Sequence, residues 1–516
     1  MKRILAVFLS ASCALAASAA MERVATLQIN NTTAIVKSVN EIGKMAGNQA
    51  LTGILTGVLM QNAFVEEFGP MRTGADASAL VAFYLDESKA CLTNAECSTF
   101  TVLYPVAGGK AKVVKRHEGA VETNGVVRLD GDDYLAFSKD GKWVAKADSA
   151  ELAKAALGDI QSVQKGSLNA STLAKFKVNS KGIAVLARLC EAAKAKDPDS
   201  AFIADYYREL LKMVSSFAFS VAVVPQGVDL QGVVKPVEGT ELAKLGLKSL
   251  PADILGKVDR NALGADCFVT DMGSGSAIQV WKDIIAALKK SGLDVNPFLS
   301  VEEQGRAQKM TIDPVVLVRM MKAESNNMFK AWIEKCASSA EKPAFFADLE
   351  KDLSATVRRQ CAAGFKADGE PMQTMFVLKG HTPKYSPAER FAATFPGCGL
   401  TNLIHISANS YVAMVKPMVQ AVEKELGEEE RAMLSPFVAQ LPDEAKGGVA
   451  AFARREQGKL VLKARISADE IKGIGDIANV VLQAVMMGQL GNLGDDDDDD
   501  CEDDDDDDED DDDDED

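Results

Sequence analysis

The strongest chemical signal in the sequence is a run of acidic residues at its C-terminal end. Residues 495–516, called the acidic tail below, hold 21 acidic residues out of 22 and are interrupted only by Cys501. A segment with no apolar residue to bury and strong self-repulsion does not fold alone, so we expect an extended polyanion. Carboxylates are hard oxygen ligands for calcium, so the tail predicts weak, diffuse calcium binding. The carboxylates expected to serve as ligands are Asp495, Asp496, Asp497, Asp498, Asp499, Asp500, Asp503, Asp504, Asp505 and Asp506.

Three roles are open for the acidic tail. It could keep a nearly neutral protein in solution without any partner. It could bind cations loosely, since extracellular calcium lies in the millimolar range of weak sites. It could also dock to a basic protein surface or to a mineral face.

The three histidines do not form a metal-binding pattern. His117, His381 and His405 are far apart, and none has a second histidine at helical spacing. No pair of cysteines has the Cys-x-x-Cys spacing of a zinc site. We therefore expect three ordinary surface or strand histidines.

A glycine–serine loop is the best candidate for a small-anion site. The segment Gly-Ser-Gly-Ser at 273–276 follows a predicted strand at 267–270 and precedes a predicted helix at 277–290. Free N–H groups at such a helix start can bind phosphate. The loop lacks the lysine of a Walker A motif, the third glycine of a dinucleotide fingerprint and the serine of a hydrolase elbow. A helix cap at Ser276 after a tight glycine turn explains it more simply.

Other acidic residues offer no defined site. Residues 130–133 (Asp-Gly-Asp-Asp) lack the further ligand spacing of a calcium loop, and a hairpin turn is the better interpretation. Paired carboxylates could support hydrolysis. However, the 54 acidic residues outside the tail (75 less 21) provide no basis for choosing a pair. We name no catalytic and no cofactor-binding residue.

The N-terminus has the layout of a secretory signal peptide. A basic start at Lys2 and Arg3 precedes an apolar stretch that runs to about Ala17, and Ala17 and Ala19 are small residues at a cleavage site. The residues before Cys13 make a poor lipoprotein box. We expect cleavage after Ala19 and export to the periplasm or the extracellular space.

Charge and hydropathy exclude two partner classes. Without the tail, 57 basic residues face 54 acidic ones, so no concentrated basic surface for nucleic acid is expected. The two longest apolar stretches, 47–64 and 473–493, are interrupted by polar residues, so no integral membrane insertion is expected. The oligomeric state is not predicted.

The chain outside these terminal segments predicts an α+β fold, because strands and helices come in clusters rather than in strict alternation. Hairpin turns are expected at Asp140-Gly141, at 225–227 and at 456–458. Asp148 is expected to cap a helix that ends near Leu157. Strands are predicted at 22–30, 79–85, 98–106, 112–116, 125–129, 134–138, 142–146, 183–189 and 403–407, and helices at 33–68, 190–214, 239–245, 277–290, 409–441 and from Ser467 onward.

The order strand, helices, hairpin and short capped helix occurs twice, about 230 residues apart. It predicts two similar halves, 20–250 and 251–494, between a signal peptide at 1–19 and the tail at 495–516. The repeat has two explanations, an internal duplication and the common grammar of α+β proteins.

Together these features predict an exported, non-enzymatic protein that acts by binding or in envelope or matrix organisation. The alternative is a secreted hydrolase with an unidentified carboxylate-based site. A deep pocket with convergent polar groups would favour the hydrolase, and a shallow surface would favour binding.

Cys91 and Cys97 are predicted to form a disulfide. They flank five residues between two predicted strands, and the expected compartment is oxidising. Non-reducing peptide mapping of exported protein should link them, whereas two free thiols would contradict the bridge. The loop is short, so the bridge should add about 2 kcal/mol or less to stability. The sequence does not assign partners for Cys190, Cys267, Cys336, Cys361, Cys398 and Cys501.

Overall fold

The computed structural model describes residues 22–48, 53, 63–74, 77–85, 98–129, 133–196, 201–269, 277–290, 293–322, 351, 355 and 370–492. The predicted signal peptide, Cys91 and Cys97, the glycine–serine loop at 273–276 and the acidic tail lie outside these residues.

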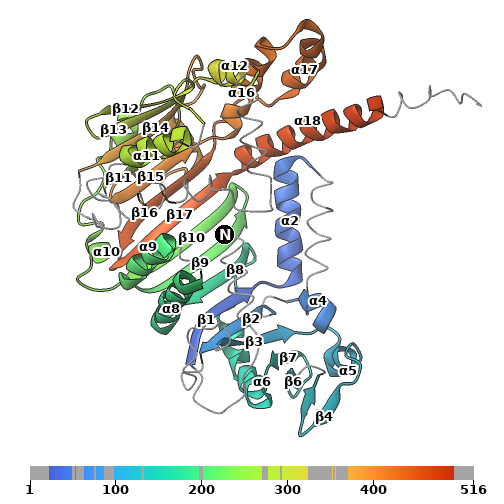
Figure 1. The fold of residues 1–516 in the computed structure, drawn as a ribbon. Helices are drawn as coiled ribbons and strands as arrows, with labels where there is room; N and C mark the ends of the chain where they lie inside the picture. Colours follow the sequence, from blue (N-terminus) through green and yellow to red (C-terminus); the bar gives the residue numbers. More distant parts are fainter. Residues whose placement is uncertain are drawn as a thin grey trace, which may run out of the picture.

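The described part of the chain forms a mixed α+β fold around one sheet of 17 strands (Figure 1). From one edge to the other, hydrogen-bonded neighbours follow the order β4-β5-β6-β7-β3-β2-β1-β8-β9-β10-β17-β16-β15-β11-β14-β13-β12. Every neighbouring pair is antiparallel except β13 with β14. The strands are β1 (Glu22–Ile29), β2 (Ala79–Leu85), β3 (Ser98–Pro105), β4 (Val121–Thr123), β5 (Val126–Arg128), β6 (Tyr134–Phe137), β7 (Trp143–Ala147), β8 (Thr172–Val178), β9 (Val214–Val224), β10 (Gly227–Pro236), β11 (Ala262–Phe268), β12 (Leu299–Gln304), β13 (Ala307–Ile312), β14 (Met372–Leu378), β15 (Leu403–Asn409), β16 (Val449–Glu456) and β17 (Lys459–Ser467).

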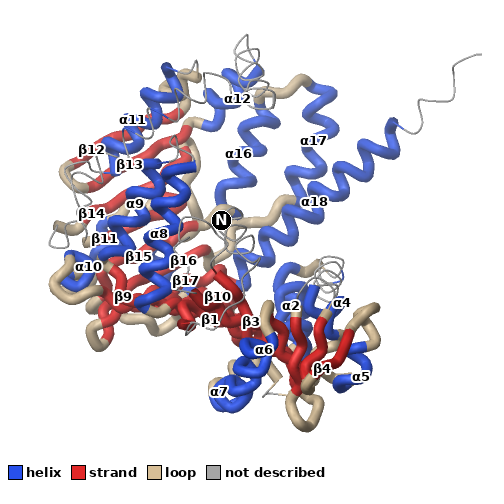
Figure 2. Tube along the Cα trace, turned by 60° about the horizontal axis from the view of Figure 1, so that its bottom comes forward, coloured by secondary structure: helices blue, strands red, loops and turns tan. Residues whose placement is uncertain are grey.

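Helices pack on both faces of this sheet (Figure 2). Their bounds are α2 (Thr32–Ala46), α4 (Ala63–Phe68), α5 (Gly109–Val114), α6 (Ala150–Ala156), α7 (Ile160–Lys165), α8 (Ser180–Lys196), α9 (Ala201–Lys212), α10 (Glu241–Lys244), α11 (Ala277–Lys290), α12 (Pro314–Lys322), α15 (Pro387–Thr394), α16 (Val412–Lys424), α17 (Glu428–Gln440) and α18 (Ala468–Asn492).

The two faces can be followed across the strands, because directly paired residues of antiparallel neighbours point to the same side. One face, called the α8 face, carries Phe176 on β8, which packs with Ile183 of α8 in one core cluster. The opposite face, called the α15 face, carries Phe452 on β16. The Phe452 ring contacts those of Phe391 and Phe395 around α15, with centroids 6.4 and 5.0 Å apart.

Strands β2 to β7 build a smaller lobe at one end of the sheet (Figure 1). One side of this lobe buries a cluster that contains Tyr104, Phe68 of α4 and Val113 of α5. The other side buries Leu103 and Trp143 against Ala156 of α6. The lobe therefore has helices over both faces of its strands.

The long helix α18 leaves the sheet at the end of β17 and crosses the C-terminal end of α2 (Figure 1). The two helices approach closely at Gly475, where a Cβ atom would lie 2.0 Å from the carbonyl oxygen of Ala46. Glu470 in the first turn of α18 is fully buried. Its carboxylate accepts hydrogen bonds from Ser410 Oγ (2.9 Å) and from the backbone N–H groups of Tyr411 (2.8 Å) and Val412 (3.1 Å). It thereby caps the start of α16.

Most predicted strands and hairpins occur where the sequence places them. The hairpins β6–β7, β9–β10 and β16–β17 form around the predicted turns. The last of these turns has Gln457 and Gly458 at φ 47° and 76°, the left-handed conformation of a two-residue hairpin loop. The helix predicted at 277–290 matches α11. The order in which these elements occur confirms the α+β class.

Two predicted strands are helices in the structure. Residues 112–116 fall largely in α5, in which Val113 is the one buried residue. A segment of five residues is too short for its hydrophobic pattern to distinguish a helix from a strand. Residues 183–189 lie in α8, where Ile183 and Leu186 face the core at helical spacing. The strand that precedes α8 is β8.

Two helix boundaries also differ from prediction. The sequence predicts one helix at 33–68, but α2 ends at Ala46. Gly47 adopts φ 64°, and its N–H donates to the backbone carbonyl oxygens of Gly43 and Lys44, which terminates the helix. Helix α6 is capped by Ser149, which accepts from the N–H of Leu152 at 3.2 Å, and not by Asp148.

Replacing Glu470 with alanine should destabilise the fold by about 3 kcal/mol, because three buried donors would lose their acceptor. Urea unfolding followed by circular dichroism would measure the change. The matched control is Asp469→Ala in the same helical turn, where the side chain is exposed and a change within about 0.5 kcal/mol is expected. Equal losses for both variants would contradict a special role for the buried carboxylate.

Candidate functional site

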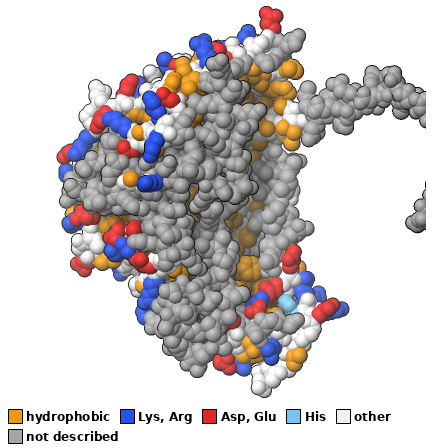
Figure 3. Space-filling model, in the orientation of Figure 1, with side chains coloured by type: hydrophobic (Ala, Val, Ile, Leu, Met, Phe, Trp, Pro, Cys, Tyr) orange, Lys and Arg blue, Asp and Glu red, His pale blue; other side chains and the backbone are white. Residues whose placement is uncertain are grey.

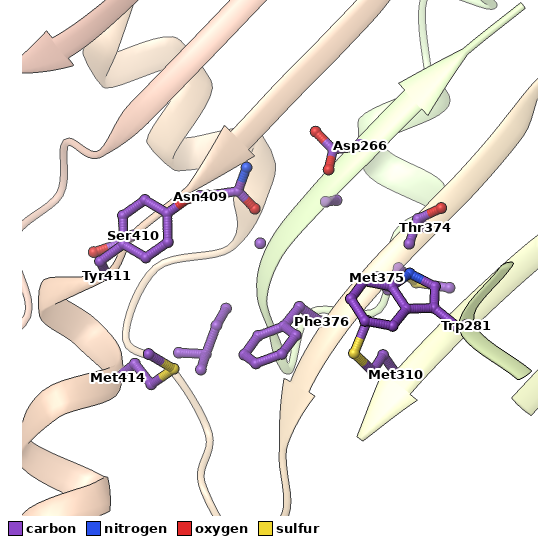
Figure 4. A pocket seen from close by; sticks show the side chains of 13 residues that line it. Asp266, Trp281, Met310, Thr374, Met375, Phe376, Asn409, Ser410, Tyr411 and Met414 are labelled. Carbon is purple, nitrogen blue, oxygen red and sulfur yellow. The ribbon is translucent and has the colours of Figure 1, made fainter. Parts of the chain in front are cut away.

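A cavity of about 450 Å³ lies on the α8 face of the sheet, between β11, β13 and β14 and the helix α11 (Figure 4). This volume falls within the range of small-molecule sites. Strand β11 and helix α11 both contribute lining residues. These are the strand before and the helix after the glycine–serine loop that the sequence analysis singles out.

Three chain segments supply the polar side chains of the cavity. Asp266 on β11 is paired directly with Thr374 on β14, so both side chains point to the same face. Asn409 lies at the end of β15, next to β11. Gly264 makes room for it, because a Cβ atom at this position would lie 1.8 Å from Asn409 Oδ1. A larger residue at 264 would therefore displace the Asn409 amide.

Polar and apolar side chains gather at opposite ends of the cavity (Figure 4). Asp266, Asn409 and Thr374 lie along one end. The other end is apolar, and Trp281 of α11 lies beside it. The apolar side chains there are Phe376, Met310 and Met414. This arrangement suits a molecule with an apolar body and one polar group.

Three of the polar side chains at this site are already hydrogen-bonded within the protein. Asn409 Nδ2 donates to Ser407 Oγ (2.8 Å), and Ser410 Oγ donates to Glu470 (2.9 Å). Thr374 Oγ1 donates to Gln308 Oε1 (3.3 Å). Asp266 has neither a hydrogen bond nor an ion pair with any described residue. Its carboxylate is thus a charged group available to a ligand.

His405 lies on the same face as Asp266, two positions further along the paired strands. Burial lowers the pKa of the His405 imidazole, and the nearby Asp266 carboxylate only partly opposes this. The lowered pKa favours the uncharged imidazole, which does not form an ion pair with the Asp266 carboxylate. The sequence interpretation of His405 as an ordinary strand residue misses this proximity.

A second polar cluster, around Arg390, is paired within the protein at both Arg390 Nη atoms, while Arg390 Nε has no hydrogen-bond partner among the described residues. The Arg390 side chain is fully buried, and its Nη2 lies 3.0 Å from Glu444 Oε2. The other Glu444 oxygen lies 2.8 Å from His381 Nε2, and the backbone N–H of Lys384 donates to Glu444 Oε2 at 2.8 Å. These contacts hold the loop before α15 to the loop before β16. The cluster is structural, because its charges face one another.

The remaining sequence candidates have separate positions. In the turn before β6, Leu129 N donates to Asp133 O (2.8 Å), which supports a hairpin, and the Asp133 carboxylate pairs with Lys146 (2.8 Å). Cys190, Cys267 and Cys398 are free thiols, and burial raises the pKa of Cys267 to about 12. Within the described ranges, no group of three or more potential metal ligands occurs. The glycine–serine loop, the proposed disulfide and the tail carboxylates lie outside the described residues.

No protein-family model, curated protein or solved structure matches this chain. In the part of the chain that the structure describes, no helix is both long and apolar enough to cross a membrane. Basic and acidic side chains are interspersed on the face shown in Figure 3. The site must therefore be interpreted from its own geometry.

The sequence alone does not single out Asp266 or Trp281. One local signal was present, since Asp266 is a charged residue inside a strand whose neighbours Ala265 and Cys267 are buried. A charge in such a strand is costly unless it has a purpose or a partner. Trp281 carries no comparable signal, because its spacing in α11 is that of an ordinary amphipathic helix.

Proposed function

We propose that this chain is an exported, non-enzymatic binding protein whose body holds a small organic cation with an apolar group. The observation that carries this proposal is the Asp266 carboxylate, which has no partner among the described residues and lines an otherwise largely apolar cavity. A carboxylate beside apolar surface gains most from a cationic partner.

Two aromatic side chains of the cavity support a cationic ligand. Trp281 and the exposed Tyr411 both line it. The faces of such rings attract ammonium groups, and quaternary ammonium ligands are commonly held in this way. An anionic ligand would meet the charge of Asp266 and gain nothing from the rings.

The same geometry argues against a carboxylate-based hydrolase at this cavity. Hydrolysis of that kind uses two carboxyl groups about 5–9.5 Å apart. Asp266 is the single carboxylate among the described residues that line the cavity. Binding therefore accounts for the site better than hydrolysis.

We further propose that the acidic tail binds calcium diffusely once the protein has been exported, and that it serves in envelope or matrix organisation. Support comes from the density of carboxylates in residues 495–516 and from the signal-peptide layout of the N-terminus. The body contributes no cluster of metal ligands within the described ranges.

We also infer that the two halves of the body share one architectural plan. The order β8-α8-α9-β9-β10-α10 in the first half is matched by β15-α16-α17-β16-β17-α18 in the second. Strands β10 and β17 pair antiparallel with Gln231 opposite Lys463, and each of these residues is the fifth of its strand. A local two-fold axis would pass through this pair. An internal duplication would explain both features.

Benzyltrimethylammonium should bind the body with one-to-one stoichiometry, whereas benzylsulfonate should not bind. Isothermal titration calorimetry would measure both ligands. Asp266→Asn should weaken binding of the cation by about tenfold or more, because a charge-assisted contact is lost. Both proteins carry the acidic tail, so nonspecific cation uptake by the tail is the same in each.

The matched control is Asp253→Asn, an exposed carboxylate outside the cavity that pairs with Lys257. This change should leave the affinity unaltered. Equal affinities for the wild type and for Asp266→Asn would contradict the proposed site.

Deleting residues 495–516 should abolish most low-affinity calcium uptake and leave the melting temperature almost unchanged. The charges of the tail act over a screening length of only about 8 Å at physiological salt, so they scarcely affect the core. Calorimetry of the full-length and truncated proteins, at low and physiological salt, would show weak, many-sited and salt-sensitive binding in the first alone. Equal uptake by both proteins would place the calcium site in the body.

A further inference from the structure

The middle of the α15 face carries lysines that have no ion-pair partner among the described residues. One row of directly paired residues crosses four strands, from Lys175 on β8 through Ser220 and Gln231 to Lys463 on β17. Paired residues share a face, so both lysines point to the same side. Lys177 and Lys235 lie on this face as well, in neighbouring rows. We call Lys175, Lys177, Lys235 and Lys463 the lysine strip.

The lysine strip is open to solvent and is not neutralised. Lys177, Gln231 and Lys235 are exposed, and Lys175 and Lys463 are half-buried. The nearest carboxylate along these strands, Asp229, is occupied by Arg465, whose Nη2 lies 2.8 Å from Asp229 Oδ2. None of the four lysines forms an ion pair with a described residue. Partial burial and the neighbouring Lys177 ammonium lower the pKa of Lys175, so an anion on this face would raise that pKa.

We propose that the acidic tail of the same chain docks across the lysine strip, and that calcium releases it. This inference rests on the proposed calcium binding by the tail. The charges are complementary, since the tail carries 21 acidic residues while the rest of the chain is nearly neutral. The attachment of the tail to α18 also raises its effective concentration near the sheet above that of any free polyanion.

The length of the tail allows this contact only for its last residues. Helix α18 begins beside the sheet, where the Ala468 N–H donates to Gln226 O (2.8 Å), and its 25 residues span about 37 Å. Helix α18 continues away from the end of β17 (Figure 1), so the distance from that end back to Lys463, about 13 Å, adds to this length. An extended chain covers about 3.4 Å per residue, so roughly 15 residues beyond Asn492 are needed to reach Lys463. Residues from about 507 onward can therefore contact the strip.

Calcium and the lysines would compete for the same carboxylates. A calcium ion bound by several tail carboxylates removes the negative charge that attracts the strip. The contacts are exposed, so added salt should weaken them as well. The tail would thus cover the α15 face at low calcium and leave it free at high calcium.

Zero-length carbodiimide cross-linking of the full chain, followed by mass spectrometry of the monomer, tests this proposal. At low salt and with a calcium chelator present, Lys175, Lys177 and Lys463 should be linked to carboxylates within residues 507–516. Replacing these three lysines with glutamine removes three charges from the strip, so the yield of links between the remaining Lys235 and the tail should fall by about tenfold, as expected for the loss of three exposed ion pairs. Millimolar calcium should have a similar effect.

Two controls make the result specific. Lys282 lies on α11, which covers the opposite face of the sheet. The Lys282→Gln variant should therefore leave the links between the strip and the tail unchanged. A chain truncated after Asp504 keeps 9 of the 21 acidic residues and should still take up calcium, yet it is too short to reach the strip. It should lose the links to Lys463 and Lys175.

Several outcomes would overturn the proposal. These are links found only in dimers, links formed by residues 495–500 in place of the end of the tail, or links to the strip that calcium does not reduce. Absence of links between the strip and the tail in the full chain, with calcium uptake by the full chain intact, would refute docking alone. Absence of calcium uptake in the full chain would refute the calcium proposal instead.

Discussion

Eight register pairs between β10 and β17, from Gly227 with Ser467 to Val234 with Leu460, carry one sheet through both halves of the chain. An ion pair between Asp229 and Arg465 spans the same two strands. At the end of this pairing the Ala468 N–H bonds to Gln226 O, so the start of α18 is attached to the β9–β10 turn. The direction of α18, the packing of α2 against it and the continuous α15 face all depend on this contact between segments 226 to 240 residues apart.

Buried charge imposes a second constraint on the structure. Glu470 and Arg390 are both fully buried, and each has partners that come from other parts of the chain. Removing one partner from such a set leaves an uncompensated polar group, which costs more than the set contributes when complete. These two residues therefore specify how α16, α18 and the loop before α15 meet. Asp266 differs from them, because it lines a cavity and lacks a partner within the described ranges, and this contrast separates a site for a ligand from a structural cluster.

Local turn chemistry explains which elements the sequence predicts well. The hairpins at Asp140-Gly141 and at Gln457-Gly458 follow from a glycine that readily adopts positive φ between alternating strands. The strand predictions for segments 112–116 and 183–189 were wrong, because apolar runs as short as these satisfy both the helical and the strand period. Burial in the folded protein decided between them. The end of α2 depends on a single glycine, Gly47, within a longer stretch of helical spacing.

Composition and local pattern by themselves determined the α+β class, the main hairpins and the concentration of acidic charge in one terminal segment, because these properties depend on residues close together in the chain. The tertiary structure decided the pairing of β10 with β17, and with it the row that joins Lys175 to Lys463. It also brought Asp266, Trp281 and Asn409 around one cavity, although Asn409 is far from the other two in sequence. Such contacts arise when distant strands bury their apolar faces together, and no local pattern records which strand will be the neighbour.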